Sequence, residues 1–232
     1  MGKINSKEKL IDSLKDLSNS RWIDPQADIS TNLDESLFKE VFYNIDVFTS
    51  VTSPLRYWQI NTFVLGAIRR FSHHSDELVK KSNVSIAICA VIENGLYSDV
   101  SVLDYVAKNC LGEAQVMAAR YCSVDALRAI TNSKNPKVRK VAYERLGPVE
   151  CLDDMIIDKK AEIREMGIKM APVGYSGLNS LTKEIARGPF TLLVSKISAE
   201  YLPMLMANRN LKNKWITNCL EARLLSEGEK DE

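Results

Sequence analysis

A short phrase recurs through the middle of the chain with a period of 24 or 25 residues. The phrase joins a larger residue to a small one, and it occurs at Met117-Ala118, Val141-Ala142 and Met166-Gly167. A leucine follows each copy: Leu127, Leu152, and then Leu178 or Leu181. A fixed short period is typical of solenoids, in which each unit buries its apolar face against its neighbours. The repeat therefore predicts an architecture, and by itself it predicts no chemistry.

The repeat divides the chain into three predicted segments. Residues 1–82 lack it but carry helical apolar stripes, so we expect a helical N-terminal capping region. Residues 83–225 carry pairs of short helices, and the clearest units begin near Gly112, Asn135 and Ala161. Residues 226–232 form an acidic tail that we expect to be frayed. Because no segment alternates with period two, we predict an all-α fold: a short right-handed α-solenoid of helix pairs with a helical N-terminal cap.

The capping region shows several local signals. A first helix is predicted from Lys7 to Leu17, followed by a loop over residues 18–32. Apolar residues spaced by three and four predict one amphipathic helix that starts at Asp34 and extends through Phe48. We expect its aromatic stripe to be buried. Ser53-Pro54 predicts the N-cap and first residue of the next helix.

One repeat unit carries a recognisable pattern. It reads Asn135-Pro136-Lys137-Val138-Arg139-Lys140-Val141-Ala142, then Leu146-Gly147 and Leu152-Asp153-Asp154-Met155. This string resembles the short HEAT-like repeats, and its period is similar to that of the leucine-rich-repeat variant. The resemblance covers residues 112–182 well, is weaker over 84–111 and 200–223, and departs from the family pattern at Gly167, where alanine is expected.

The resemblance implies a curved array of HEAT-like helix pairs with a binding role and no catalytic residues. It places five residues in the core: Val138, Val141, Ala142, Leu152 and Met155. It also places Arg139 and Arg164 at the starts of helices.

Composition narrows the classes of protein. The chain has 45% hydrophobic and 26% charged residues, which is ordinary for a soluble globular protein. No apolar run approaches the roughly 18 residues of a membrane span. The five cysteines are widely scattered, so we expect neither disulfides nor a zinc knuckle but reduced thiols in a cytoplasmic protein. They are Cys89, Cys110, Cys122, Cys151 and Cys219.

The net charge of +1 conceals a basic region, since residues 120–223 hold 18 Lys and Arg against 11 Asp and Glu. Two consecutive units supply the candidate binding residues, which we call the basic ladder: Lys134, Lys137, Arg139, Lys140, Arg145, Lys159, Lys160, Arg164 and Lys169. Stacked units would align these side chains so that they could follow a phosphate backbone. Alternatively, the ladder is a solvated face in which Arg139 and Arg164 pair with acids such as Asp158.

Enzymatic chemistry has little support in the sequence. His73 and His74 are the only histidines, and adjacent helical residues point about 100° apart, so we expect no shared metal site. The segment 174–177 lacks the strand that a nucleophile elbow requires. HEAT-like alkylpurine-DNA glycosylases use tryptophans with an aspartate; Trp58, Tyr143 and Trp215 could stack on a base, but no Trp-x-x-x-Asp pair occurs within a repeat. We predict no catalytic, cofactor-binding or metal-binding residues.

The N-terminal segment from Met1 to Ser6 fits the N-myristoylation pattern at Gly2, a short pattern that matches many unmodified proteins. Taken together, the residues predict a non-catalytic adaptor or scaffold in the cytoplasm that binds another protein through a helical-repeat surface. The alternative is a nucleic-acid-binding helical-repeat protein that uses the basic ladder, with a HEAT-like DNA glycosylase as its less favoured form.

Overall fold

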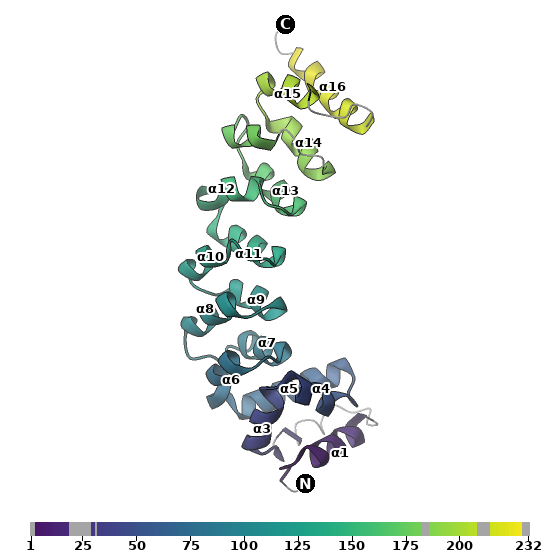
Figure 1. Cartoon of the computed structure of the whole chain (residues 1–232), viewed down its shortest axis with the longest axis vertical. Helices are drawn as coiled ribbons and strands as arrows, with labels where there is room; N and C mark the ends of the chain where they lie inside the picture. The colour runs from purple at the N-terminus through teal and green to yellow at the C-terminus, as the bar shows by residue number, and fades with distance from the viewer. Residues whose placement is uncertain (1–2, 19–28, 31, 182–185, 208–213, 229–232) are drawn as a thin grey trace. The chain divides into compact units, whose positions relative to one another are not determined.

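The computed structural model describes residues 3–18, 29–30, 32–181, 186–207 and 214–228. Throughout these ranges the elements are helices, and no β-strand is present apart from an isolated bridge between Ile4 and Leu33 (Figure 1). The prediction of an all-α fold is confirmed. No described helix is both long and apolar enough to span a membrane.

The chain forms two compact units, residues 1–132 and 133–232, and the division falls inside the segment predicted as one repeat array. The first unit contains these helices: α1 (Lys7–Ser18), α3 (Glu35–Phe42), α4 (Ile45–Thr52), α5 (Tyr57–Arg70), the 3₁₀-helix η1 (Ser72–His74), α6 (Ser75–Lys81), α7 (Ser85–Glu93), α8 (Val100–Asn109), α9 (Gly112–Ala119) and α10 (Val124–Ile130).

Most of the first unit is arranged in two rows of helices (Figure 1). In one row α5 packs on α7 and α7 on α9, while in the other α6 packs on α8 and α8 on α10. The rows are joined by contacts such as α8 with α9. Each short helix buries one apolar face: α8, for example, buries Val102, Leu103, Val106 and Ala107. The helices α7–α8 and α9–α10 are pairs of short helices of the kind that the sequence predicts after residue 82.

The prediction of one helix from Asp34 through Phe48 is wrong. Two helices, α3 and α4, replace it, because the Asn44 side chain caps α4 by accepting hydrogen bonds from the N–H groups of Asp46 and Val47. The Ser53-Pro54 prediction is also wrong, since both residues lie in the turn and α5 begins after Arg56. The Arg56 N–H instead donates to the Gln59 side chain.

The aromatic stripe of α3 and α4 is buried, as predicted. Phe38, Phe42 and Phe48 are at most 5% exposed. The Phe38 ring centroid lies 4.9 Å from that of Phe42 and 4.6 Å from that of Phe71. Such contacts between rings add to the hydrophobic stabilisation of a core. The rings of Phe38, Phe42 and Phe71 therefore join α3 to the end of α5.

The second unit contains α11 (Pro136–Leu146), α12 (Pro148–Ile156), α13 (Ala161–Met170), η2 (Ser176–Leu181), α14 (Arg187–Lys196), η3 (Ala199–Tyr201), α15 (Leu202–Ala207) and α16 (Lys214–Gly228). The helices α11 to α14 pack consecutively. Gly147 has a φ of 81°, so it ends α11 in the left-handed region, as its position before Pro148 predicts. The leucine anchors Leu178 and Leu181 lie in a 3₁₀-helix, where the repeat pattern predicts a second short helix.

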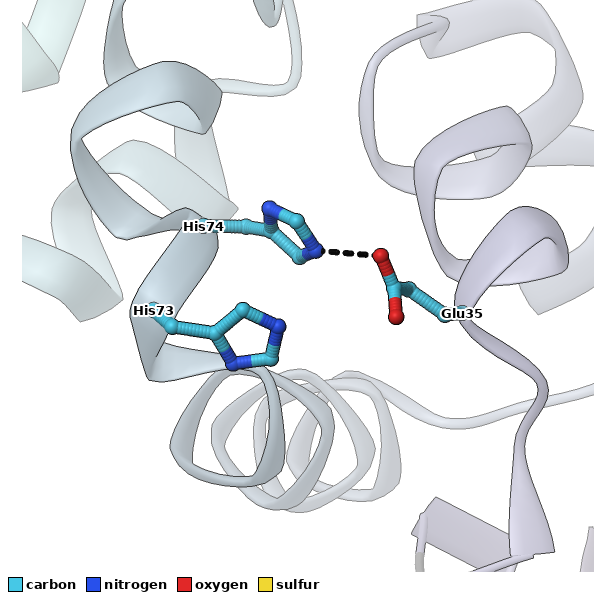
Figure 2. Close-up of side chains that lie close together, drawn as sticks. All are labelled: Glu35, His73 and His74. Atoms are coloured by element: carbon cyan, nitrogen blue, oxygen red, sulfur yellow. Dashed lines mark hydrogen bonds and ion pairs between the residues drawn. The ribbon is translucent and has the colours of Figure 1, made fainter.

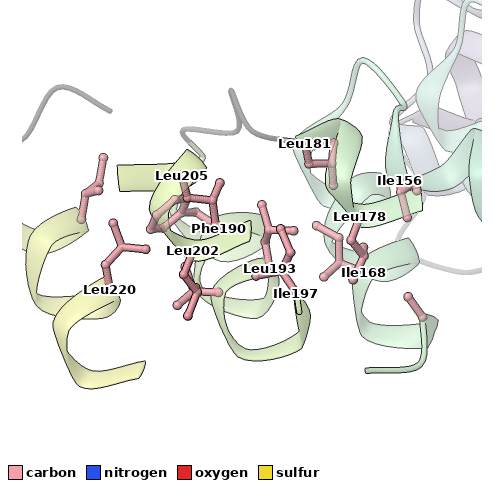
Figure 3. Packing of buried hydrophobic residues seen from close by; sticks show 13 residues of the cluster. Ile156, Ile168, Leu178, Leu181, Phe190, Leu193, Ile197, Leu202, Leu205 and Leu220 are labelled. Atoms are coloured by element: carbon pink, nitrogen blue, oxygen red, sulfur yellow. The ribbon is translucent and has the colours of Figure 1, made fainter. Parts of the chain in front are cut away.

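Gly167 shows why the repeat departs from alanine. A Cβ atom at this position would lie 2.8 Å from the Met155 Cβ and 2.9 Å from the Ile156 backbone nitrogen. The glycine therefore permits α13 to approach α12 more closely than an alanine would. Beyond this contact the unit buries a larger apolar cluster that includes Leu178, Phe190 and Leu220 (Figure 3).

Three predictions fall wholly or partly on residues outside the described ranges. Gly2, the predicted acylation site, is one of them. Most of the predicted loop over 18–32 is another, although its described residues, 18, 29, 30 and 32, are helical. Of the predicted tail, residues 226–228 end α16 and residues 229–232 are outside.

Candidate functional site

The basic ladder lies entirely in the second unit. Its residues come from α11, from α13 and from the segments just before those helices. Six of the nine are exposed: Lys134, Lys137, Arg145, Lys159, Lys160 and Lys169. The other three, Arg139, Lys140 and Arg164, are half-buried and make specific contacts within the unit.

The Arg139 side chain is mostly buried and forms hydrogen bonds inside the second unit. Its Nε and Nη2 atoms donate to the two carboxylate oxygens of Asp158, each at 2.7 Å. Its Nη1 atom donates to the Ser133 carbonyl oxygen, also at 2.7 Å. Only 12% of the Arg139 side chain and 4% of the Asp158 side chain are exposed. The alternative in which Arg139 pairs with Asp158, instead of remaining free for a phosphate, is therefore confirmed.

Arg164, which lies 25 residues after Arg139 in the sequence, repeats part of this arrangement within the same compact unit. Its Nη1 atom donates to the carbonyl oxygens of Asp158, at 2.8 Å, and Lys159, at 3.1 Å. These acceptors lie six and five residues before the arginine, as do the carbonyl groups of Ser133 and Lys134 that Arg139 contacts. Each arginine thus holds the turn that leads into its own helix, and this explains the recurrence of arginine at a spacing of 25 residues.

The environment of Asp158 keeps its carboxyl ionised. Burial on its own raises the pKa of Asp158, but the hydrogen bonds from Arg139 and from the Lys160 N–H outweigh burial and hold the pKa below its ordinary value. Burial and the charge of Asp158 also raise the pKa of the neighbouring Tyr143 to about 12. A buried bidentate pair of this kind is a strong, charge-assisted contact.

Acidic residues dilute the remaining positive charge. The Lys140 Nζ atom lies 2.6 Å from the Glu162 Oε1 atom, which pairs α11 with α13 at the surface. The 25-residue period also places Glu165 at the position of Lys140, and Lys169 at that of Glu144. At these positions consecutive repeats carry opposite charges, an arrangement that favours pairing between repeats over a continuous track for a polyanion.

The aromatic residues proposed for base stacking differ in exposure. Trp58 is 40% exposed on α5 of the first unit. In the second unit Tyr143 is buried, and Trp215 packs edge-on against Phe190 with ring centroids 5.4 Å apart. Tyr143 and Trp215 therefore serve the packing of the second unit.

A groove that sequence reasoning missed crosses one row of the first unit. It has a volume of about 530 Å³ and runs over α5, α7 and α9. Its lining residues are Tyr57, Asn61, Val64, Leu65, Ser85, Ile86, Cys89, Ala90, Glu93, Asn94, Glu113 and Met117. The charged residues among them are both acidic, Glu93 and Glu113, and both are exposed. We call this feature the acidic groove.

The groove combines an apolar floor with negative charge. Burial raises the pKa of the Cys89 thiol, and the nearby carboxylates of Glu93 and Glu113 raise it further. Since the thiolate is the nucleophilic form, this cysteine is suited to packing and not to nucleophilic catalysis. One signal in the sequence could have indicated the groove: residues 86–92 of α7 are all apolar, so Ile86, Cys89 and Ala90 are left half-buried after the core face of the helix is packed.

His73 and His74 do not point apart as predicted. Ser72–His74 is a 3₁₀-helix between α5 and α6, and its three residues per turn set successive side chains about 120° apart, so the helix geometry does not account for the closeness of the two rings. The two ring centroids lie 4.1 Å apart, and both histidines lie beside Glu35 of α3 (Figure 2).

The chain matches no protein-family model, no curated protein and no solved structure. Its resemblance to HEAT-like repeats therefore stays a prediction.

Proposed function

We propose that the chain is a non-catalytic scaffold that binds another protein in the acidic groove. The observation that carries the proposal is the groove itself, which has a volume of about 530 Å³, crosses three consecutively packed helices and bears two carboxylates. A groove with apolar side chains across packed helices can receive a peptide segment laid over it.

The architecture behind this proposal is a short right-handed α-solenoid of HEAT-like helix pairs with an N-terminal cap. Three observations support it. The helices α5, α7 and α9 pack in order in one row, with α6, α8 and α10 in a second. The phrase in the sequence recurs every 24 or 25 residues. The arginine contacts of α11 recur in α13.

The groove defines the chemistry of the partner. Leu65, Ile86 and Met117 offer apolar contacts, so the bound segment needs aliphatic or aromatic anchors. Glu93 and Glu113 would attract lysine, arginine or an amino terminus, and they would repel phosphates. Tyr57, which is 76% exposed, supplies a large amphipathic ring at the same surface.

The proposed location is the cytoplasm. The five cysteines all lie in the described ranges and form no disulfide bond, and Cys122 and Cys151 are buried. Cysteines that form no disulfide bond are typical of proteins in reducing compartments.

A binding assay with peptides of defined charge tests the function. We would measure fluorescence anisotropy of labelled amphipathic peptides, identical in their apolar residues but carrying either lysine or glutamate between them. The lysine peptides are expected to bind the full chain, and the double variant Glu93→Lys/Glu113→Lys is expected to lose this binding. The matched control is Glu144→Lys/Glu165→Lys, which reverses two exposed acids of the second unit. Equal binding by both double variants would contradict the proposed groove.

The same titration separates the scaffold from the nucleic-acid alternative. Binding of an oligonucleotide to the exposed ladder residues should weaken steeply with added salt, whereas a groove with an apolar floor should be less sensitive. The ladder variant for this comparison is Lys137→Glu/Lys159→Glu, because both lysines are exposed. Arg139 is unsuitable for it, since its loss would disrupt the unit.

A further inference from the structure

Three metal-ligating side chains from two separate segments converge in the first unit. Glu35 is the first residue of α3, while His73 and His74 lie in the turn between α5 and α6. One ligand atom from each of the three lies within 4.8 Å of the others. Figure 2 shows the two imidazole rings side by side, with the Glu35 carboxylate facing them.

The structure holds these groups in place by packing. Asp34 caps α3 through the Ser36 N–H and fixes the start of the helix, so Glu35 is presented from a rigid element. The His74 ring stacks near Phe38 at a centroid distance of 6.4 Å, and only 14% of its side chain is exposed. His73 lies beside Phe71 at 6.3 Å. The rings are thus oriented by the same aromatic core that joins α3 to α5.

Both nitrogens of the His74 ring face carboxylates. Its Nε2 atom lies 2.7 Å from the Glu35 Oε1 atom, and its Nδ1 atom lies 3.6 Å from the Glu77 Oε2 atom. The 3.6 Å separation is too long for a hydrogen bond, so only Nε2 pairs directly with a carboxylate. A cation between Nε2 and Glu35 would use the Nε2 lone pair and leave the ring proton on Nδ1, on the side of Glu77.

We propose that Glu35, His73 and His74 bind a divalent transition-metal ion of the class that prefers imidazole, with Zn²⁺ as its representative. Two histidines and a carboxylate supply three ligands, and a water completes four-coordination. Glu77 acts from the outer shell by orienting the His74 ring, as carboxylates commonly do behind a ligating histidine.

Binding requires only small movements of side chains. Ligand atoms about 2.0–2.2 Å from a tetrahedral zinc ion lie roughly 3.3 Å apart. The His74 Nε2 and Glu35 Oε1 atoms would therefore separate slightly from 2.7 Å, and the ligand atoms of all three residues already lie within 4.8 Å of one another. Lys39, whose Nζ atom lies 3.6 Å from Glu35 Oε1, would turn away toward solvent or Glu77. Glu35 and His73 are exposed, so the ion can enter from solvent.

A bound ion would tie α3 to the turn between α5 and α6, two segments that lie far apart in the sequence. It would therefore stabilise the first unit by linkage. At a hundredfold excess of Zn²⁺ over its dissociation constant, the melting temperature should rise by about 5–10 °C. This site shares no residue with the acidic groove, so it stands independently of the proposed function.

The test is calorimetric titration of the full chain with Zn²⁺ after removal of metals by a chelator. One ion per chain is expected, with the affinity reduced at least about 10-fold by His73→Gln and by Glu35→Gln. Both residues are exposed, so neither substitution should prevent folding. Glu40→Gln is the matched control, because Glu40 is another exposed acid on α3 and lies outside the cluster.

Two spectroscopic readouts identify the ligands. The chain has two histidines, so nitrogen-detected NMR of the imidazoles should show both shifting on addition of Zn²⁺. The visible spectrum of the Co²⁺ complex should lack the thiolate charge-transfer band that coordination by cysteine produces. The proposal is overturned if the chain binds no Zn²⁺, if His73→Gln and Glu35→Gln leave the affinity unchanged, or if the thiolate band shows that the cysteines hold the ion.

Discussion

Replacing Asp158 with alanine removes the carboxylate that holds Arg139 inside the second unit. The substitution deletes both 2.7 Å bonds to the Arg139 guanidinium and the 2.7 Å bond from the Lys160 N–H. Arg139 keeps its hydrogen bond to the Ser133 carbonyl oxygen, but its positive charge loses the opposing carboxylate. With 12% of the side chain exposed, water can replace little of what is lost.

The expected cost follows from the burial of the pair. Removing one partner of a buried ion pair costs about 3–5 kcal/mol, because the other charge is left uncompensated. The remaining carbonyl contact and the small exposure of Arg139 place the value toward the lower end, so we expect Asp158→Ala to lower the free energy of unfolding by about 3–4 kcal/mol. That loss is a large fraction of the 5–15 kcal/mol typical of a domain.

Urea denaturation followed by circular dichroism measures this loss, and hydrogen exchange with mass spectrometry assigns it to the helices α11 to α13. The matched control is Glu162→Ala, which breaks the exposed pair with Lys140. The two side chains of that pair are 38% and 62% exposed, so its loss should cost about 0–1 kcal/mol. The double variant Arg139→Met/Asp158→Ala should recover much of the stability, since it leaves no buried charge.

Equal costs for Asp158→Ala and Glu162→Ala would refute the argument, because they would mean that Arg139 does not depend on its buried partner. Strict additivity in the Arg139 and Asp158 double-mutant cycle would lead to the same conclusion. In either case Arg139 would again be a candidate for binding phosphates at the surface.

Three further predictions concern stability. Gly167→Ala should lower the free energy of unfolding by about 1–3 kcal/mol in urea denaturation, because the new methyl group meets Met155 and the Ile156 backbone and this outweighs alanine's better helix propensity; an unchanged or higher stability would contradict the close approach of α12 and α13. Phe38→Ala should cost about 3–5 kcal/mol and reduce amide protection in α3 and α5, since it removes a fully buried ring; unchanged protection there would count against the aromatic core. Because the folded structure holds the pKa of Asp158 below its ordinary value, the stability from this group is complete above the unfolded pKa of about 3.9 and is lost as the pH falls through the folded pKa. If the free energy of unfolding of Asp158→Asn falls with acid by the same amount as that of the unchanged protein, this prediction is wrong.

Local sequence signals predicted much of the helical structure. The period of 24 or 25 residues located α9, α11 and α13 near their observed starts, because each apolar stripe is packed on the face that its spacing defines. Asn135 caps α11, and Gly147 ends it, in the positions that their chemistry favours. The sequence suggested the contact of Arg139 with Asp158 as an alternative to phosphate binding, because both residues occupy defined places in the repeat.

Features that depend on contacts distant in sequence were not predicted. The break between α3 and α4 rests on Asn44, whose capping role competes with an unbroken apolar stripe. Gly167 is required by the approach of α12, which its own helix does not reveal. The convergence of Glu35 with His73 and His74, and the groove over α5, α7 and α9, arise only when separate helices pack together.

The central claim is that the acidic groove binds a protein, and photo-crosslinking in the native cell tests it most directly. A benzoylphenylalanine in place of Tyr57 would be compared with one in place of Val149, which is 98% exposed in the second unit. The account predicts a specific protein crosslinked from position 57, lost when Glu93 and Glu113 are changed to lysine, and absent from position 149. Crosslinks to nucleic acid, or the same proteins recovered from both positions, would contradict it.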